Sequence, residues 1–305
     1  MLPSAIPANA DSPRIVASIK PVHSLVAMVT EGIAEPYLIV KGAHSPHGYA
    51  MRPSDAKALT DADVIFWIGP ALETFLAKPL NALSSKARIV SLLDEEPEAA
   101  AHHDKKHDHK HEKEHDHKHD QKHTESDGHD HGGIDPHVWL DPAHALEMVE
   151  HIAETMIEIL PNEKARIMQN QARALASLKL LEADIRRTLA PYQHNHVVVL
   201  HEAYNHFTRH FGLEDFIALT VSPEHKPGPA RVIEIRKEIA EHDVRCVFAE
   251  PQFPDTYIRL LVEGTPARAA TLDPVGATIE PGPALYPTLM KNMAASLKDC
   301  LSGAS

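Results

Sequence analysis

Histidine, a residue type well suited to binding transition metals, is concentrated in one stretch of this chain. Between His102 and His131 the sequence holds eleven of the 24 histidines, nine acidic residues, six lysines and no hydrophobic residue. Neutral imidazole is a good ligand for Zn, Cu and Ni. With nothing apolar to bury, the stretch cannot offset its own conformational entropy. Residues 101–133 are therefore predicted to form a mobile, metal-collecting loop; a solubilising charged linker and an expression tag are the alternatives.

The loop offers many overlapping pairs of imidazoles, which predicts several weak metal sites. Its candidate auxiliary ligands are His102, His103, His107, His109, His111, His115, His117, His119, His123, His129 and His131. Selective binding needs a few ligands that a rigid scaffold holds in fixed geometry. We therefore expect the selective site among the histidines outside the loop.

Four potential metal ligands outside the loop follow predicted strands. They are His47, His137, His201 and Asp273. In open α/β sheets, ligands bind beyond the carboxyl ends of the strands. Three imidazoles with one carboxylate or water make a tetrahedral set for Zn²⁺, with Zn–N distances near 2.0–2.1 Å. For any one of the four, the alternative is an ordinary hydrogen-bonding role at a strand end.

The remaining histidines are interpreted as surface or packing residues. His206 and His210 have i, i+4 spacing, but Phe207 stands where a zincin has its catalytic Glu. His44 and His225 lie in Pro-flanked loops that could line a cleft, and their roles stay open. The other residues interpreted in this way are His23, His144, His151, His194, His196 and His242. The sequence has no nucleophile elbow, Walker loop or GxGxxG motif.

The elements that must position these residues alternate between strands and helices. Short apolar, often β-branched runs predict strands at residues 15–19, 37–40, 64–68, 88–92, 196–200, 216–219, 244–248 and 269–272. Helical segments between the strands indicate the α/β class, with parallel-type sheets flanked by helices.

A long segment with few helix breakers separates the two sets of strands. Residues 162–189 predict one rigid helix of about 42 Å, which is long enough to bridge two lobes. The predicted organisation is an N-terminal α/β lobe at 1–160 that contains the His-rich loop, a bridging helix at 161–190, and a C-terminal α/β lobe at 191–305.

Composition restricts the possible partners. The chain has 305 residues, 43% of them hydrophobic, and a formal net charge of −13. This negative charge, without a basic cluster outside the His-rich loop, argues against nucleic acid binding. No apolar run approaches the roughly 20 residues needed to span a bilayer. We expect a monomer.

The N-terminus and the cysteines suggest an exported protein. Ala8-Asn9-Ala10 is similar to a signal-peptidase site, which predicts a removed or trimmed export signal. Cys246 lies in a predicted core strand, and Cys300 lies near the end of a predicted helix. If they pair, they close a loop of about 55 residues, worth about 4 kcal/mol, in an oxidising compartment such as the periplasm. Two independent buried thiols are the alternative.

Five segments together resemble one known family. SPHGYAMRPSD, DPHVWLDP, VVVLHEAYNHFTRHFGL, CVFAEPQF and TLDPVG are similar, in order and spacing, to segments of the periplasmic zinc-binding proteins of bacterial zinc ABC importers. The resemblance runs from about Ile15 to Cys300 and includes the His-rich insertion. It implies two α/β lobes bridged by one long helix, with zinc in the cleft between them.

The resemblance also implies roles for individual residues. The three histidine ligands of the family fall on His47, His137 and His201, and its disulfide falls on Cys246 and Cys300. Manganese-binding relatives have Glu at the position of His201, which favours zinc. The fourth ligand corresponds to Asp273 in some members and to a Glu before the first His in others. Pro46 occupies that second position here, which leaves Asp273 or water.

The expected function is a periplasmic solute-binding protein that captures Zn²⁺ and delivers it to an inner-membrane ABC permease. The His-rich loop would serve as an auxiliary metal collector, and no enzymatic activity is expected. Two alternatives stay open. One is a zinc metallohydrolase in which Glu202, next to His201, serves as general base. The other is a periplasmic zinc buffer without a permease.

Overall fold

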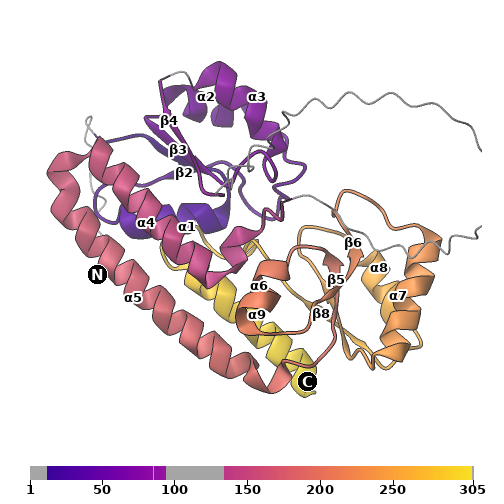
Figure 1. Cartoon of the computed structure of the whole chain (residues 1–305). Helices are drawn as coiled ribbons and strands as arrows, with labels where there is room; N and C mark the ends of the chain where they lie inside the picture. Colours follow the sequence, from indigo (N-terminus) through magenta and orange to yellow (C-terminus); the bar gives the residue numbers. More distant parts are fainter. Residues whose placement is uncertain (1–11, 85, 94–133, 304–305) are drawn as a thin grey trace, which may run out of the picture. The chain divides into compact units, whose positions relative to one another are not determined.

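The computed structural model of the protein describes residues 12–84, 86–93 and 134–303 (Figure 1). Apart from Ile134, all of them belong to one compact unit. The eleven histidines of the predicted loop and the Ala8–Ala10 segment lie outside the described residues. The metal-collecting loop and the export signal thus stay predictions from sequence.

The first half of the chain forms a four-stranded parallel sheet in the order β2-β1-β3-β4. Its strands are β1 (Ile15–Ala17), β2 (Tyr37–Leu38), β3 (Val64–Trp67) and β4 (Arg88–Ser91). All four residues of β3 are buried, as expected of a parallel strand covered on both faces. The predicted strands are all present. β2 is shorter than predicted, although the backbone N–H groups of Ile39 and Val40 still bond to Ala17 and Ser18.

The second half forms another four-stranded parallel sheet, in the order β6-β5-β7-β8. Its strands are β5 (Val198–His201), β6 (Ile217–Thr220), β7 (Cys246–Ala249) and β8 (Arg268–Thr271). The helices that connect them are α6 (Asn205–Phe211), α7 (Pro229–Glu241) and α8 (Thr256–Val262). Val198, Val247, Ile235 and Ile258 belong to one apolar cluster, which joins the sheet to α7 and α8.

The long helix predicted between the two sheets is present as α5 (Lys164–Leu189), which has 26 residues and is therefore about 39 Å long. It contacts three other helices, as Figure 1 shows: α1 (Lys20–Val29), α4 (Pro142–Ile159) and the C-terminal α9 (Leu285–Ser302). The remaining helices are α2 (Pro53–Asp61), α3 (Thr74–Leu83) and the short 3₁₀ turns η1 (Val138–Leu140), η2 (Pro161–Glu163) and η3 (Ala190–Tyr192). The predicted fold class is confirmed.

The last helix, α9, contacts elements from both halves of the chain. α9 contacts α1 and α5 as well as β8. The Tyr286 hydroxyl, in its first turn, donates to the carbonyl of Trp139 at 2.8 Å. At its other end, Cys300 forms a disulfide with Cys246 in β7, with Cα atoms 6.1 Å apart. The cysteine pairing that the resemblance implied is thus confirmed.

Candidate metal centre

The structure brings three of the four candidate ligands together. His47 lies in the loop after β2, His137 directly precedes η1, and His201 is the last residue of β5. One ring nitrogen from each lies within 4.8 Å of the other two. His137 and His201 are 4% and 3% exposed, whereas His47 is half-buried. Residues from both halves of the chain therefore contribute to a single cluster.

The spacing of the ring nitrogens suits a small tetrahedral cation. The Nε2 atoms of His47 and His137 are 3.2 Å apart. Two nitrogens bound to one tetrahedral Zn²⁺ at 2.0–2.1 Å would be separated by about 3.3 Å. The Nε2 atom of His201 is buried and has no hydrogen-bond partner among the described residues. This atom is thus free to bind a metal.

His137 is fixed by its own neighbours in the sequence. The Oδ1 atom of Asp135 accepts hydrogen bonds from the backbone N–H of His137 at 3.0 Å and from its ring Nδ1–H at 2.8 Å. Two residues after it, the fully buried Trp139 donates its Nε1–H to the carbonyl of Pro274 at 2.7 Å. Asp141 then caps α4 by accepting from the N–H of Ala143. The DPHVWLDP segment therefore forms a rigid turn.

His201 is fixed by a residue from the neighbouring strand. Glu250 follows β7, which pairs with β5. Its Oε1 atom accepts from the Nδ1–H of His201 at 2.8 Å and from the hydroxyl of Tyr204 at 3.3 Å. The two side chains of this pair are 4% and 1% exposed. A carboxylate that accepts from Nδ1 keeps the proton on that atom and leaves the lone pair on Nε2.

Burial keeps two of the imidazoles neutral. Burial, together with the nearby rings of His137 and His201, lowers the pKa of His47 from 6.5 to about 3. Burial also lowers the pKa of His137, despite its hydrogen bond to Asp135. Neutral imidazole is the form that binds metals. His47 and His137 are therefore in their ligand form at neutral pH.

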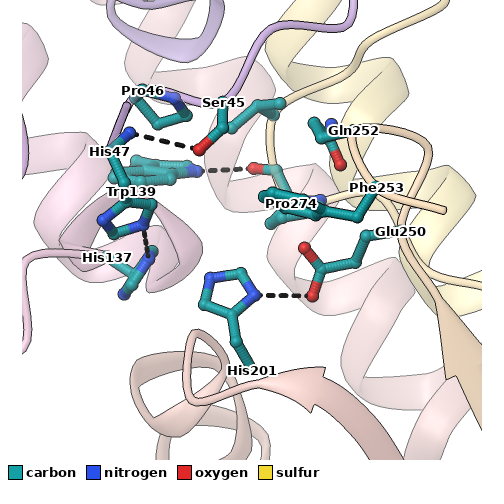
Figure 2. A pocket seen from close by; sticks show the side chains of 11 residues that line it. Ser45, Pro46, His47, His137, Trp139, His201, Glu250, Gln252, Phe253 and Pro274 are labelled. Carbon is teal, nitrogen blue, oxygen red and sulfur yellow. Dashed lines mark hydrogen bonds and ion pairs between the residues drawn. The ribbon is translucent and has the colours of Figure 1, made fainter. Parts of the chain in front are cut away.

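The three histidines line a very small pocket, shown in Figure 2. Its volume is about 10 Å³, close to the minimum that holds one water molecule. Trp139, Phe253 and Pro274 form apolar parts of its wall, and Glu250 lies beside His201. The pocket thus has room for an ion but not for an organic molecule.

Asp273, the fourth candidate, does not join this cluster. Its Oδ1 atom accepts from the Gln252 amide at 2.9 Å and from the N–H groups of Val275 and Gly276 at 3.1 and 3.0 Å. Its Oδ2 atom accepts from the N–H of Ala277 at 2.6 Å. In the structure this carboxylate is therefore engaged in holding the turn after β8.

The loop that Asp273 holds is also fixed from the first half of the chain. The Nζ atom of Lys20, at the start of α1, donates to the carbonyls of Gly276, Ala277 and Ile279 at 2.9, 2.7 and 2.9 Å. Lys20 is only 5% exposed. The loop after β8 thus has its N–H groups bound by Asp273 and its carbonyls bound by Lys20.

Two of the histidines interpreted as packing residues contact the DPHVWLDP segment. His206 donates from Nε2 to the backbone carbonyl of Asp135 at 3.1 Å. His210 lies between Asp141, at 2.6 Å, and Glu182, at 3.0 Å. The hydrogen bond to Asp141, partly offset by burial, raises the pKa of His210. Both residues support the scaffold of the site and do not belong to the metal cluster.

Asp135 and Glu250 were missed by reasoning from sequence alone. Histidines that bind metals usually donate their second N–H to a carboxylate or carbonyl. Asp135 lies two residues before His137, so this rule could have identified it. Glu250 lies far from His201 in sequence, and its role depends on β7 lying next to β5. Only the strand order reveals that contact.

The two loop histidines with open roles, and Glu202, lie outside the pocket lining. His44 Nε2 is 3.3 Å from the guanidinium of Arg52. His225 is exposed. Glu202 is also exposed, and its Oε1 atom accepts from the amide of Asn205 at 3.2 Å. The general base of the hydrolase alternative is thus directed to a neighbouring amide.

Comparisons of sequence identify relatives over almost the whole chain. The model of the family described as "Zinc-uptake complex component A periplasmic" matches residues 15–300. The chain is 41% identical to the "High-affinity zinc uptake system protein ZnuA" of Brucella suis biovar 1 (strain 1330), over 94% of this chain and 91% of that one. It is 35% identical to the protein of that name from Yersinia pestis, over 99% of this chain and 96% of that one.

Comparisons of structure find the same fold. The periplasmic zinc binding protein TroA from Treponema pallidum has a TM-score of 0.78 at 20% identity, over 95% of this chain and 99% of that one. A crystal structure of ZnuA has a TM-score of 0.74 at 22% identity, over 94% and 98% of the two chains. Within the described ranges, none of the helices is both long and apolar enough to cross a membrane.

Proposed function

We propose, because the chain belongs to the family of periplasmic zinc-uptake complex components, that it captures Zn²⁺ in the pocket between His47, His137 and His201. The observation that carries this proposal is a cluster of three histidines in the lining of a pocket with an ion-sized volume of about 10 Å³. The captured ion is the cargo of a zinc-uptake system, so the protein is a solute-binding component.

The three histidines supply three nitrogen ligands through Nε2. We propose that water is the fourth ligand, because Asp273 would have to give up four hydrogen bonds to coordinate the ion. Asp273 as fourth ligand is the alternative that the sequence suggested. Apolar walls formed by Trp139, Phe253 and Pro274 help to exclude further water.

Transport fits the site better than catalysis. A hydrolase needs space for its substrate beside the metal and a base directed toward the metal-bound water. The pocket holds about one ion, and Glu202 is exposed and bonded to Asn205. We therefore propose that the protein has no enzymatic activity. Zinc-loaded protein should hydrolyse esters and phosphate esters no faster than its His201→Ala variant.

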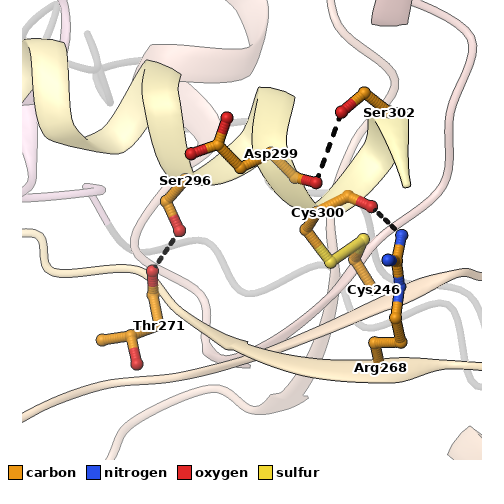
Figure 3. The surroundings of a disulfide bond; sticks show 7 residues. All are labelled: Cys246, Arg268, Thr271, Ser296, Asp299, Cys300 and Ser302. Atoms are coloured by element: carbon orange, nitrogen blue, oxygen red, sulfur yellow. Dashed lines mark hydrogen bonds between the residues drawn. A yellow bond between two sulfur atoms is a disulfide. The ribbon is translucent and has the colours of Figure 1, made fainter. Parts of the chain in front are cut away.

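The cellular setting follows from the family and the disulfide. Cys246 and Cys300 are joined beside Arg268, whose guanidinium donates to the carbonyl of Cys300 (Figure 3). Disulfides persist in oxidising compartments. We propose a monomeric protein that works in the periplasm after removal of an export signal and delivers zinc to an inner-membrane ABC permease. A zinc buffer without a permease is the alternative, which a zinc-transfer assay with that permease would separate.

We also propose the division of the chain expected from sequence. An N-terminal lobe comprises residues 1–160, a bridging helix 161–190, and a C-terminal lobe 191–305. Residues 101–133 would add weaker metal sites. The 26-residue α5 supports the bridging segment.

The decisive experiment is zinc stoichiometry, measured by calorimetry and by competition with a chelator. Full-length protein should bind one zinc tightly and additional zinc weakly. Deletion of residues 101–131 should leave the tight site and remove the weak ones. Loss of the tight site on deletion would show that its ligands lie in the deleted segment and not at His47, His137 and His201.

A further inference from the structure

We propose that Glu250 and Asp135 are positioning residues of the metal centre. Each holds one histidine with its Nε2 lone pair directed into the pocket, and the two carboxylates together balance the charge of a divalent cation. The inference rests on the proposed zinc site and deepens it, since it concerns residues behind the ligands.

Glu250 is almost fully buried and accepts a hydrogen bond from His201. Its side chain is 1% exposed, and its Oε1 atom accepts the Nδ1–H of His201 at 2.8 Å. The Tyr204 hydroxyl donates to the same oxygen at 3.3 Å and fixes the carboxylate from the other side. The Oε2 atom is buried without a partner among the described residues. Burying a carboxylate with one free oxygen is costly unless a nearby positive charge compensates.

Asp135 does the same for His137. Its Oδ1 atom accepts from both the backbone N–H and the ring Nδ1–H of His137. From α6, His206 donates to the backbone carbonyl of Asp135 at 3.1 Å. The Oδ2 atom of Asp135 is also buried without a hydrogen-bond partner in the described part of the chain. Each of the two carboxylates that hold a pocket histidine thus keeps one oxygen without a hydrogen bond, and His206 Nε2 lies 3.8 Å from that oxygen of Asp135.

His47 has no such support. In the described ranges its ring has one hydrogen-bond partner, the ring of His137. Nothing therefore selects one of its tautomers through a carboxylate. The centre consists of two oriented imidazoles and one that must adapt, and His47 serves as an internal reference for the other two.

The charge balance points in the same direction. Three neutral imidazoles leave the two positive charges of Zn²⁺ uncompensated in a pocket with apolar walls. Carboxylates behind the imidazoles raise the basicity of the ligands and offset this charge without entering the coordination sphere. Asp273, saturated by the turn after β8, lacks the free oxygen that Glu250 and Asp135 each retain.

The test uses the full-length protein with two substitutions at each position. Glu250→Leu and Asp135→Leu remove both the acceptor and the charge. Glu250→Gln and Asp135→Asn remove the charge but keep an oxygen that can accept the Nδ1–H. Glu73 offers a matched control, because it is a fully buried carboxylate that accepts from Ser18 and from the N–H groups of Ile68 and Gly69.

Two properties are measured: the zinc dissociation constant by chelator competition, and the histidine tautomers of the metal-free protein by long-range ¹H–¹⁵N NMR. Melting of the metal-free protein identifies variants that do not fold. In the wild type, His201 and His137 should carry the proton on Nδ1, whereas His47, whose Nε2 faces the unprotonated Nε2 of His137, should carry it on Nε2. The Leu variants should lose this preference at their own histidine and bind zinc about 10–100-fold more weakly, the usual cost of removing such partners.

The Gln and Asn variants should keep the tautomer and lose less affinity than the Leu variants. Glu73→Gln should change neither property. Unchanged tautomers and unchanged affinity in the folded Glu250 and Asp135 variants would overturn the positioning roles, as would equal losses in the Gln and Leu variants. If wild type and His201→Ala bind zinc equally, the proposed site itself is wrong, and this result is distinct from the others.

Discussion

Two carboxylates that follow neighbouring strands differ in the hydrogen bonds they make. Glu250 follows β7 and Asp273 follows β8, and the two strands are paired. Asp273 gives both oxygens to the turn that follows it. Glu250 accepts a hydrogen bond from His201 with one oxygen, and its other oxygen has no hydrogen-bond partner among the described residues. A carboxylate at the correct edge of a sheet is therefore a potential ligand only if the local backbone leaves it free.

The difference follows from side-chain length. Asp has one methylene group, which suits it to accept from backbone N–H groups a few residues further along the chain. Asp273 does this with Val275, Gly276 and Ala277. Glu has one more methylene group, and Glu250 extends instead to the adjacent strand β5. At the same edge of the sheet, Asp273 thus stabilises the fold and Glu250 supports the metal site.

The largest expected effect is a loss of zinc affinity when His201, the partner of Glu250, is replaced. His201→Ala removes a nitrogen ligand and leaves Glu250 without its partner, so zinc affinity should fall by more than about 100-fold, beyond the usual cost of an outer partner. At a zinc concentration of 100 times the wild-type dissociation constant, about 2.7 kcal/mol of zinc-linked stabilisation should largely disappear. Chelator competition and melting at fixed free zinc measure the two effects. A loss below tenfold would exclude His201 as a ligand.

The pH dependence of tight binding should be weaker than that of ordinary imidazoles. Three histidines with a pKa of about 6.5 would cost about 10⁴-fold in affinity between pH 7 and pH 5. The pKa of His47 is lowered to about 3, and that of His137 is also lowered. Protons therefore do not compete at His47 until the pH approaches 3. We expect a loss below about 100-fold in protein that lacks residues 101–131.

The same shift has a consequence for the metal-free fold. The pKa of His47 is lowered in the folded state. Below a pH of about 6.5 the unfolded chain therefore binds a proton at His47 that the folded chain does not bind. Stability should therefore decrease as the pH falls from about 6.5 toward 3. His47→Gln should reduce this slope in denaturant titrations, and an unchanged slope would contradict the assignment.

Much of this arrangement could be predicted from sequence. The strands are apolar runs bounded by loops, and the three histidines follow them in motifs such as DPHVWLDP. The hydrogen bonds that occupy Asp273 could not be predicted from sequence, because they depend on the backbone path from Val275 to Ala277. The contact between Glu250 and His201 depends on β5 pairing with β7, although β6 comes between them in the chain. Interactions across a sheet require the strand order.

Substitution of Asp273 should lower the stability of the fold and leave the zinc affinity almost unchanged. Asp273→Ala leaves three backbone N–H groups and the Gln252 amide without their acceptor, and buried unsatisfied groups cost about 1–3 kcal/mol each. Because some of these donors can reach water, we expect a total of about 2–4 kcal/mol in the free energy of unfolding of the metal-free protein. Zinc affinity of the folded fraction should change less than about threefold. A tenfold loss of affinity at unchanged stability would instead make Asp273 the fourth ligand.

The smallest effect should come from Lys20, which holds the same loop from the opposite side. Lys20→Met keeps most of the aliphatic stem and removes the ammonium that bonds to three carbonyls. Burial lowers the pKa of Lys20, against the charges of Asp273 and Glu280, so part of the gain from these hydrogen bonds is already spent on desolvation. We expect a loss of about 1–2 kcal/mol in the metal-free protein. Lys57→Met is the control, because within the described residues Lys57 forms only an exposed i, i+4 pair with Asp61. This variant should lose no more than about 0.5 kcal/mol of stability. If the two lysine variants are equally stable, Asp273 alone holds the loop after β8.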